Sequence, residues 1–167
     1  IRLYISTLSR KSMYPIPWQG RQNGIMYQIG RDRLSQGFRL YATLPGEHEA
    51  VAVCRCTADA GMCETLAEQE TLPFPAELPC YSTITGVDLG HQGQGLARAL
   101  LAHEQEELKK IPRGVHVLTF MDDGLERLRP IYLRFGYEPL LIPQIPWSRT
   151  EGWVYRLTGS QRDPCDS

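Results

Sequence analysis

The sequence predicts an α/β fold in which helices pack on the faces of a mixed β-sheet. Two observations lead to this fold class. An early pair of strands is joined by a tight turn, and a strand–helix–strand–helix–strand order follows from residue 80 onward. A tight turn joins antiparallel neighbours, whereas strands joined through a helix can lie parallel, so we expect both kinds of pairing.

The first half of the chain contains one clear hairpin. Residues 37–44 and 49–57 flank the turn signal Pro45-Gly46, which predicts two antiparallel strands. Residues 1–7 alternate well enough to predict a further strand. Prolines and glycines interrupt residues 9–36, so we expect any helices there to be short.

The second half alternates strands and helices more clearly. The β-branched residues of 80–89 predict a strand, and leucines at helical spacing follow from Gly95 to about Lys110. Residues 115–121 predict the next strand. A second helix should begin at the aspartate pair that follows and end at Gly136, a residue type that is common just beyond helix ends.

The chain is expected to form a single domain. Residues 138–142 and 152–158 predict the last two strands, so the domain covers residues 1–158 and a polar tail covers 159–167. A length of 167 residues is about one domain's worth. Hydrophobic residues make up 42% and charged residues 22%, which is typical of a soluble globular protein.

Charge is nearly balanced overall but unevenly distributed. A net charge of −1 argues against a dedicated binder of nucleic acid or anionic membranes. Residues 1–40 hold seven basic and one acidic residue, and residues 41–90 hold one basic and eight acidic residues. The first block would suit an anionic partner and the second a cationic amine. The charged residues from Glu104 to Lys110 are expected to form the solvated face of the first long helix.

Cysteine usage and hydropathy predict a reduced, cytoplasmic protein. Five cysteines are too few for a disulfide scaffold, and the first residues lack the basic-then-apolar build of a signal peptide. Cys54 and Cys56 face the same way on a predicted strand, which favours core packing, and no spacing completes a zinc tetrad. We therefore expect no metal site. No apolar run is long enough to span a membrane, so we expect no membrane partner.

The most informative segment is the turn between the strand ending at Val87 and the helix from Gly95. Glycines at positions 90, 93 and 95 allow close approach of a ligand. The first turn of a helix has unpaired N–H groups, so this turn predicts a phosphate site. The spacing fits neither the GxxxxGK[ST] loop nor the GxGxxG fingerprint. The alternative is a turn that merely needs glycine.

Two motifs resemble the signatures of the GNAT family of N-acetyltransferases. Gln92-Gly-Gln-Gly-Leu-Ala97 matches [Gln/Arg]-x-x-Gly-x-[Gly/Ala], and Tyr132-Leu-Arg-Phe-Gly-Tyr137 matches Tyr-x-x-x-Gly-[Phe/Tyr]. The resemblance covers about residues 80–158. It implies a GNAT-type mixed, mostly antiparallel central sheet of six to seven strands with helices on both faces. It also implies acetyl-CoA as co-substrate.

The resemblance assigns cofactor-binding residues. The glycine turn should bind the pyrophosphate through backbone N–H groups, and the strand before it should hydrogen-bond the pantetheine arm. That strand should carry a bulge, for which Gly86 is suited, and should splay from the next strand. The assigned residues are Ile84, Thr85, Gly86, Val87, Gln92, Gly93, Gln94, Gly95, Leu96, Ala97 and Arg98.

Tyr132 matches the family's tyrosine that protonates the leaving thiolate. A phenol with a pKa of about 10 is mostly protonated at neutral pH. Backbone N–H groups near residues 85–87 could stabilise the oxyanion. The alternative is a core aromatic on the face shared with Phe135. Pro130 lies inside the expected helix, which is therefore either kinked or begins late with the proline in its first turn.

No carboxylate stands where many relatives carry a glutamate on the central strand. That position falls near Tyr81, so we expect Tyr81 and Ser82 to line the acceptor site and act through water. Asp88 and Glu77 are the other candidates for the general base. The missing glutamate and Pro130 leave open a catalytically silent CoA-binding module.

The acceptor is expected to be an amine on a small molecule, peptide or protein. Tyr14 and Trp18 are predicted to form one wall of its site and Trp147 the opposite wall. The transfer would be a direct attack in a ternary complex, because no cysteine lies on the two motifs. A nucleic-acid-directed acyltransferase, of the aminoacyl-tRNA toxin type or a base modifier, is the alternative. A homodimer is left open.

Overall fold

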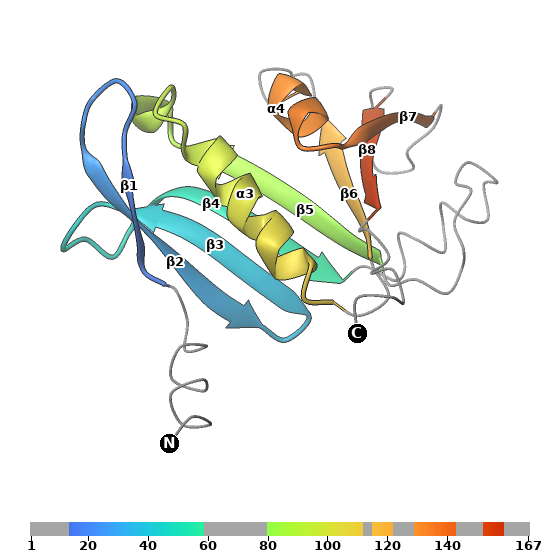
Figure 1. The fold of residues 1–167 in the computed structure, drawn as a ribbon, viewed down its shortest axis with the longest axis horizontal. Coiled ribbons are helices and arrows are strands. Elements are labelled where there is room, and N and C mark those ends of the chain that lie inside the picture. Colours follow the sequence, from blue (N-terminus) through green and yellow to red (C-terminus); the bar gives the residue numbers. More distant parts are fainter. Residues whose placement is uncertain (1–13, 59–79, 112–114, 122–128, 143–151, 159–167) are drawn as a thin grey trace, which may run out of the picture.

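The structure is a computed structural model, and it describes residues 14–58, 80–111, 115–121, 129–142 and 152–158 (Figure 1). The expected strand over residues 1–7 and the tail over 159–167 lie outside these ranges. The described elements are β1 (Ile16–Gln19), β2 (Met26–Leu34), β3 (Gly37–Thr43), β4 (Ala50–Ala58), β5 (Cys80–Val87), the 3-10 turn η1 (Leu89–His91), α3 (Leu96–Leu108), β6 (His116–Met121), α4 (Arg129–Arg134), β7 (Glu138–Ile142) and β8 (Gly152–Thr158).

The strands form one sheet in the order β1-β2-β3-β4-β5-β6-β8-β7. Only the pairing of β5 with β6 is parallel among the described strand pairs, and the others are antiparallel. The mixed, mostly antiparallel α/β class is therefore confirmed. The sheet has eight strands instead of the expected six to seven.

The difference comes from β1 and β2, which sequence analysis did not identify. Gly30 in the middle of β2 was expected to interrupt regular structure. In the fold this glycine lies beneath the Tyr41 ring of β3, where a Cβ would come within 2.5 Å of a ring carbon. The glycine is thus needed for close packing inside the strand, and Tyr27 and Ile29 beside it are fully buried.

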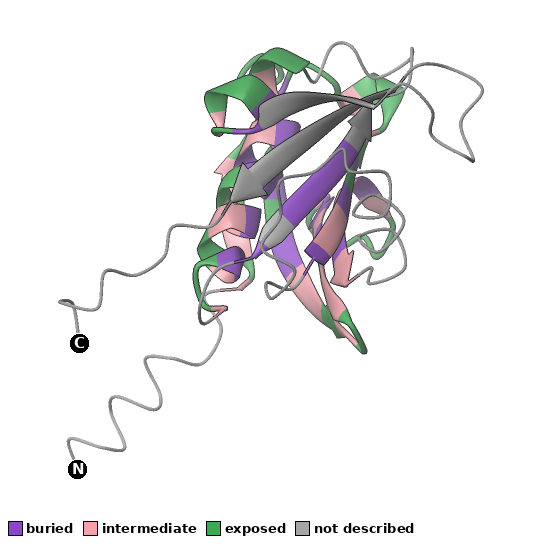
Figure 2. Ribbon diagram, turned by 90° about the vertical axis from the view of Figure 1, so that its right-hand side faces the viewer, coloured by how far each residue is buried: buried purple, intermediate pink, exposed green. Residues whose placement is uncertain are grey.

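Helix α3 lies across β3, β4 and β5 (Figure 1). The buried residues gather where this helix meets the central strands (Figure 2), because Leu96, Leu100, Leu101 and Leu108 share one side of the helix. Helix α4 lies beside α3, and Gln105 Nε2 donates a hydrogen bond to the carbonyl that follows α4, 2.6 Å away. We expected helices on both faces of the sheet. Among the described residues, these two helices cover one face. No described helix has the length and apolar character that crossing a membrane requires.

The cysteines correct one expectation and confirm another. Cys54 and Cys56 are free thiols, and both are fully buried, as core packing on β4 predicts. Cys80 at the start of β5 is disulfide-bonded, with a partner outside the described residues. The expectation of five reduced cysteines was therefore wrong, because an odd count does not exclude a pair.

Candidate active site

The loop between β5 and α3 is shaped by glycines with left-handed backbone. Gly93 has φ of 80° and Gly95 has φ of 77°, a conformation that other residues rarely adopt. Gly95 is the N-cap of α3, and no side chain caps this helix end. The first turn of α3 therefore points uncapped N–H groups toward the loop. This is the local geometry that the predicted phosphate site requires.

The turn between β1 and β2 is fastened onto this loop. Gln94 Oε1 accepts hydrogen bonds from the N–H groups of Gln22 and Asn23 at 3.0 and 2.9 Å. The carbonyl of Gln94 accepts from Trp18 Nε1 at 3.1 Å. The side chain of Gln94 is buried and bonds protein backbone, and its carbonyl is occupied, so only its backbone N–H is left for a ligand. Trp18, predicted in the acceptor wall, lies instead against the loop.

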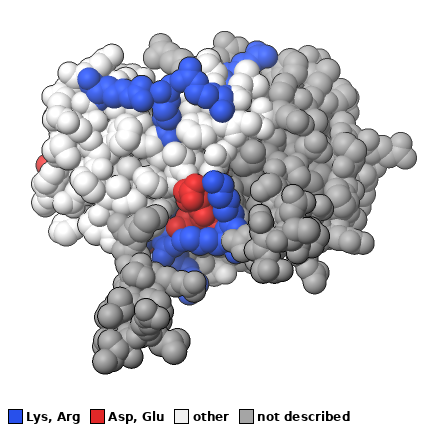
Figure 3. Space-filling model, viewed as in Figure 1, with Lys and Arg blue, Asp and Glu red and all other residues white. Residues whose placement is uncertain are grey.

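Three arginines surround the start of α3. The Arg21 side chain lies over Gly95, with Nε 3.1 Å from the position a Cβ would take. The pKa of Arg98 is lowered by desolvation and by the positive charges of Arg134 and Arg21 nearby. Figure 3 shows Lys and Arg side chains gathered in a stripe at this end of the molecule. Like charges held together favour an anion between them.

Strands β5 and β6 separate next to this loop. Their parallel pairing ends at Ser82 and Leu118, and beyond these residues the two strands are not paired. We call this opening the fork. The expected separation of the two strands is confirmed, but the expected bulge at Gly86 is wrong. The pairing of β5 with β4 continues without a shift to Val87, so β5 stays regular and the opening arises where β6 diverges from it.

Tyr132 of α4 lies at the fork. The described α4 holds Pro130 as its second residue, where a missing N–H costs no hydrogen bond. Burial raises the pKa of Tyr132 to about 12, although the nearby side chains of Thr85 on β5 and Thr119 on β6 act in the opposite direction. Only 1% of Tyr132 is exposed. Tyr132 is thus a core aromatic residue that also lies near both of the diverging strands.

A buried carboxylate lies behind the fork. Glu104 of α3 is 0% exposed and accepts hydrogen bonds from Cys54 Sγ at 2.8 Å, Thr83 Oγ1 at 2.5 Å and the Tyr137 hydroxyl at 2.8 Å. Burial raises the pKa of Glu104, although its three hydrogen bonds act in the opposite direction. The Tyr137 ring packs edge-on against Tyr132, with 5.0 Å between centroids. Glu104 therefore connects α3, β4 and β5 with the residue that supports Tyr132.

The expectation that Glu104 belongs to a solvated helix face was wrong. Leu100 and Leu108 lie one turn before and one turn after it, so all three project from one side of α3 toward the sheet. This spacing could have predicted that Glu104 is buried. Glutamate is charged, however, and the residue type therefore favoured a solvent-exposed position. The three partners come from β4, β5 and the segment after α4, which only the folded sheet brings together.

Successive residues of β5 face opposite sides of the sheet. Thr83 and Thr85 are buried on the α3 side, and Tyr81 packs against the same core. Ile84 is 68% exposed on the other side. Ser82 points to that side too, so the predicted acceptor pair Tyr81 and Ser82 is divided between the two faces.

The remaining assigned positions offer backbone more than side chains. Leu96 and Ala97 are buried in the core beneath the first turn of α3. Gln92 Nε2 donates to the carbonyl of Val87 at 3.4 Å, which ties the loop to the end of β5. A ligand at this loop would therefore meet N–H groups, as a phosphate site requires.

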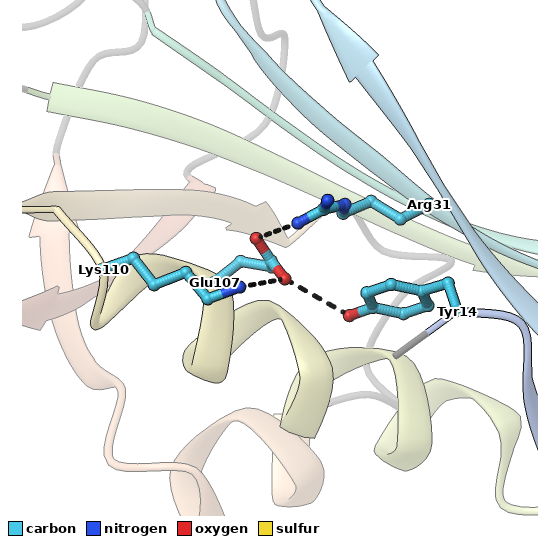
Figure 4. Close-up of polar contacts among 4 residues, drawn as sticks. All are labelled: Tyr14, Arg31, Glu107 and Lys110. Carbon is cyan, nitrogen blue, oxygen red and sulfur yellow. Dashed lines mark hydrogen bonds and ion pairs between the residues drawn. The ribbon is translucent and has the colours of Figure 1, made fainter. Parts of the chain in front are cut away.

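Tyr14 lies near the far end of α3, away from the glycine turn (Figure 4). Its hydroxyl is 3.5 Å from Glu107 Oε1, and its ring packs under the Arg31 guanidinium at 5.3 Å. Glu107 Oε2 accepts from Arg31 at 2.8 Å, and Lys110 Nζ is 3.0 Å from Oε1. The structure therefore does not bring Tyr14 together with Trp18. Trp147 lies outside the described residues.

Comparison with known proteins identifies the fold. No protein-family model matches the sequence, and no curated protein matches it. The GNAT domain of S. lividans PAT is similar, with a TM-score of 0.57, 14% identity and coverage of 86% of this chain and 96% of that one. The ribosomal-protein-S18-alanine N-acetyltransferase of Escherichia coli gives a TM-score of 0.55, 17% identity and coverage of 79% and 75%.

A third structure is that of Arabidopsis thaliana NAA60 in complex with acetyl-CoA. It gives a TM-score of 0.55 at 14% identity and covers 75% of this chain and 77% of its own. The sheet order, the fork and the glycine turn before α3 agree with what the two sequence motifs imply. The fold of this chain is therefore similar to that of these solved GNAT acetyltransferase structures.

Proposed function

We propose that the protein is an acetyl-CoA-dependent N-acetyltransferase that acts on a primary amine by direct attack in a ternary complex. The single observation that carries this proposal is the position of Tyr132, which lies near both Thr85 and Thr119 where β5 and β6 diverge. Acetyl-CoA would supply an acetyl group already activated as a thioester. The solved structure of NAA60 contains this molecule.

The residues present fit this molecule at two places. The uncapped N-terminus of α3, with Arg21, Arg98 and Arg134 around it, suits a pyrophosphate. The fork leaves one edge of β5 unpaired beyond Ser82, so its backbone can hydrogen-bond an extended arm. Backbone N–H groups of this edge would donate to the carbonyl oxygen of the thioester near the fork.

Tyr132 would hold the proton that the leaving sulfur needs. Since its pKa is raised to about 12, it remains protonated at neutral pH. The hydroxyls of Thr85 and Thr119 can stabilise the phenolate that donation leaves behind, because they lower the pKa of the same group. The general base is not assigned, and Ser82 at the open side of the fork is the predicted site of a bound water.

Binding can be tested with two glycine variants that carry equal backbone strain. Gly95→Ala places a methyl 3.1 Å from Trp18 and Arg21 atoms, whereas Gly46→Ala, at φ of 80°, meets open space in the β3–β4 turn. A ligand at a hundredfold excess over Kd stabilises by about 2.7 kcal/mol. Acetyl-CoA should therefore raise the Tm of wild type and Gly46→Ala by about 5 °C or more, but should shift Gly95→Ala much less. Absence of any shift in wild type would refute the cofactor assignment.

Catalysis can be tested with Tyr132→Phe, in an assay that follows CoA release over a panel of amines. Removal of a positioned acid should lower kcat by about 100-fold or more and leave the acetyl-CoA affinity unchanged. Because the pKa of Tyr132 is about 12, wild-type kcat should not fall through tyrosine ionisation below about pH 10. Unchanged turnover of Tyr132→Phe between pH 6 and 9 would show that the acid role is wrong.

A further inference from the structure

The sheet face opposite α3 carries a row of four side chains across four strands. The register pairs Asp32 of β2 with Arg39 of β3, Arg39 with Arg55 of β4, and Arg55 with Ile84 of β5. Residues paired across neighbouring strands point to the same face, so these four side chains form one line. We call this side of the sheet the open face.

The row is accessible to solvent. Ile84 is 68% exposed, Arg55 is exposed, and the side chains of Arg39 and Asp32 are 44% and 40% exposed. An isoleucine so exposed on a central strand is unusual for a sheet that is covered on both sides. The next row toward the glycine turn ends at Gly86, above which a Cβ would meet no atom within 4 Å. No described residue therefore covers β5 at this point, beside the fork.

The same face is hollowed toward β2. A cavity of about 350 Å³ is lined by Gln28 and Gly30 of β2 and by Tyr41 and Thr43 of β3, among others. The register places Gly30 and Tyr41 in the row next to that of the arginines. The cavity thus lies at the β2 side of the open face, next to the row of arginines.

The arginines of the row differ in their partners. Arg39 is paired with Asp32 and lies over the Tyr41 ring at 5.3 Å. Arg55 forms no hydrogen bond or ion pair with any residue in the described part of the chain, and it stands beside Arg39 in the register. Arg55 is therefore the guanidinium of the row that an added anion can join. A planar guanidinium binds a carboxylate through two parallel hydrogen bonds.

The distance from the fork limits what can bind there. Ser82, the last β5 residue paired with β6, faces the same side as Ile84, and Arg55 stands diagonally across from it. Diagonal neighbours in a sheet are about 7–8 Å apart. An extended peptide advances about 3.3 Å per residue. An amine at the fork would therefore bring the second or third residue of its chain to Arg55.

We propose that the open face binds the acceptor and that Arg55, assisted by Arg39, receives a carboxylate two to three residues from the reacting amine. The preferred acceptor is thus the N-terminus of an acidic peptide. A nucleic acid fits less well, because a run of phosphates needs several cations and Arg39 of this row is already paired with Asp32. This inference rests on the proposed acetyltransferase function. The uneven charge of the sequence suited either an anionic or a cationic partner, and the inference selects the anionic one.

The test compares peptides with a free N-terminus followed by Asp-Asp, Ser-Ser or Lys-Lys. The variant is Arg55→Gln, and the control is Arg33→Gln, an exposed arginine of β2 that pairs with Phe38 in the neighbouring position of the register and so points to the opposite face. The acidic peptide should show a kcat/KM about tenfold or more above that of the basic peptide. Arg55→Gln should raise KM for the acidic peptide about tenfold with kcat unchanged, and Arg33→Gln should not. Arg55→Glu should reverse the preference.

Two results would overturn the inference. One is equal use of the three peptides by wild type, and the other is equal loss in Arg55→Gln and Arg33→Gln. A parallel arm measures binding of a fluorescent acidic peptide without acetyl-CoA. If no peptide releases CoA but the acidic peptide binds and Arg55→Gln abolishes that binding, the transferase proposal fails and the face assignment stands. A dimer that Arg55→Glu converts to monomer in sedimentation would show that a second copy occupies the face, which also overturns the inference.

Discussion

The two faces of the central sheet are built from the same strands but differ in chemistry. On β4, Cys54 is buried against α3, while the next residue, Arg55, is exposed on the open face. On β5, Thr83 donates to the buried Glu104, while Ile84 is 68% exposed. The period of two along a strand thus places a closed hydrogen-bond network on one side and a charged, accessible row on the other.

This difference separates two tasks that the proposed acyltransferase site must combine. The α3 face holds hydroxyls and a carboxylate in fixed positions, since each is enclosed and bonded to a neighbour from another element. The open face keeps Arg55 unbonded within the described residues, so that side chain is available to a partner. Substitutions on the closed face should therefore change stability, and those on the open face should change acceptor choice.

The largest effect is expected for Glu104→Ala. The change leaves Cys54, Thr83 and Tyr137 without their acceptor and opens a cavity, so the free energy of unfolding should fall by about 3 kcal/mol or more. Urea denaturation followed by far-UV circular dichroism measures the loss. The control is Glu106→Ala on the same helix, where the exposed side chain should change stability by about 0.5 kcal/mol or less. Equal losses in the two variants would remove the distinction between the faces.

Much of this architecture was predictable because it depends on local patterns. Hydrophobic spacing located β3, β4, β5, α3 and the last two strands, and the two motifs located the glycine turn and Tyr132. Gly30 was expected to interrupt regular structure, but this glycine lies inside a strand and makes room for the Tyr41 ring of the next strand. Trp18 was predicted to line the acceptor site. Its hydrogen bond to Gln94 joins residues 76 positions apart, so local sequence could not reveal it.

The parts that failed depend on register and on long-range contacts. A bulge at Gly86 was expected, yet the opening depends on where β6 diverges, which no local signal in β5 reveals. The arginine row exists only because Arg39, Arg55 and their neighbours align across four strands. Register of this kind is set by turns and core packing together.

A smaller effect is expected in the pH dependence of Glu104. Burial raises the pKa of this carboxyl in the folded protein above its ordinary value of 4.5, so the folded state holds the proton more tightly than the unfolded state. As pH rises above that ordinary value, wild type must ionise a buried group, whereas Glu104→Gln need not. The stability advantage of wild type over Glu104→Gln should therefore shrink from pH 5 to pH 8 in urea titrations.

The control for this trend has the opposite sign. The hydrogen bond from Lys109 lowers the pKa of Glu106 below 4.5, so wild type should gain slightly on Glu106→Gln as pH rises toward about 5 and show no further change from pH 5 to pH 8. If the advantage of wild type over Glu104→Gln instead grew with pH, the three hydrogen bonds would outweigh burial. The closed face would then hold a stable carboxylate.

The smallest effects compare an ion pair from each face. Arg31 bonds Glu107 on the α3 side, where the glutamate side chain is 9% exposed (Figure 4), whereas the Arg39–Asp32 pair on the open face is 44% and 40% exposed. Arg31→Ala should therefore cost about 1 kcal/mol of unfolding free energy and Arg39→Ala about 0.5 kcal/mol or less. Added salt should weaken the contribution of Arg39 more, because its pair is less shielded from ions. Urea titrations at low and high salt measure both. Equal losses of unfolding free energy with equal salt sensitivity would show that the two ion pairs contribute equally to stability, whichever face they lie on.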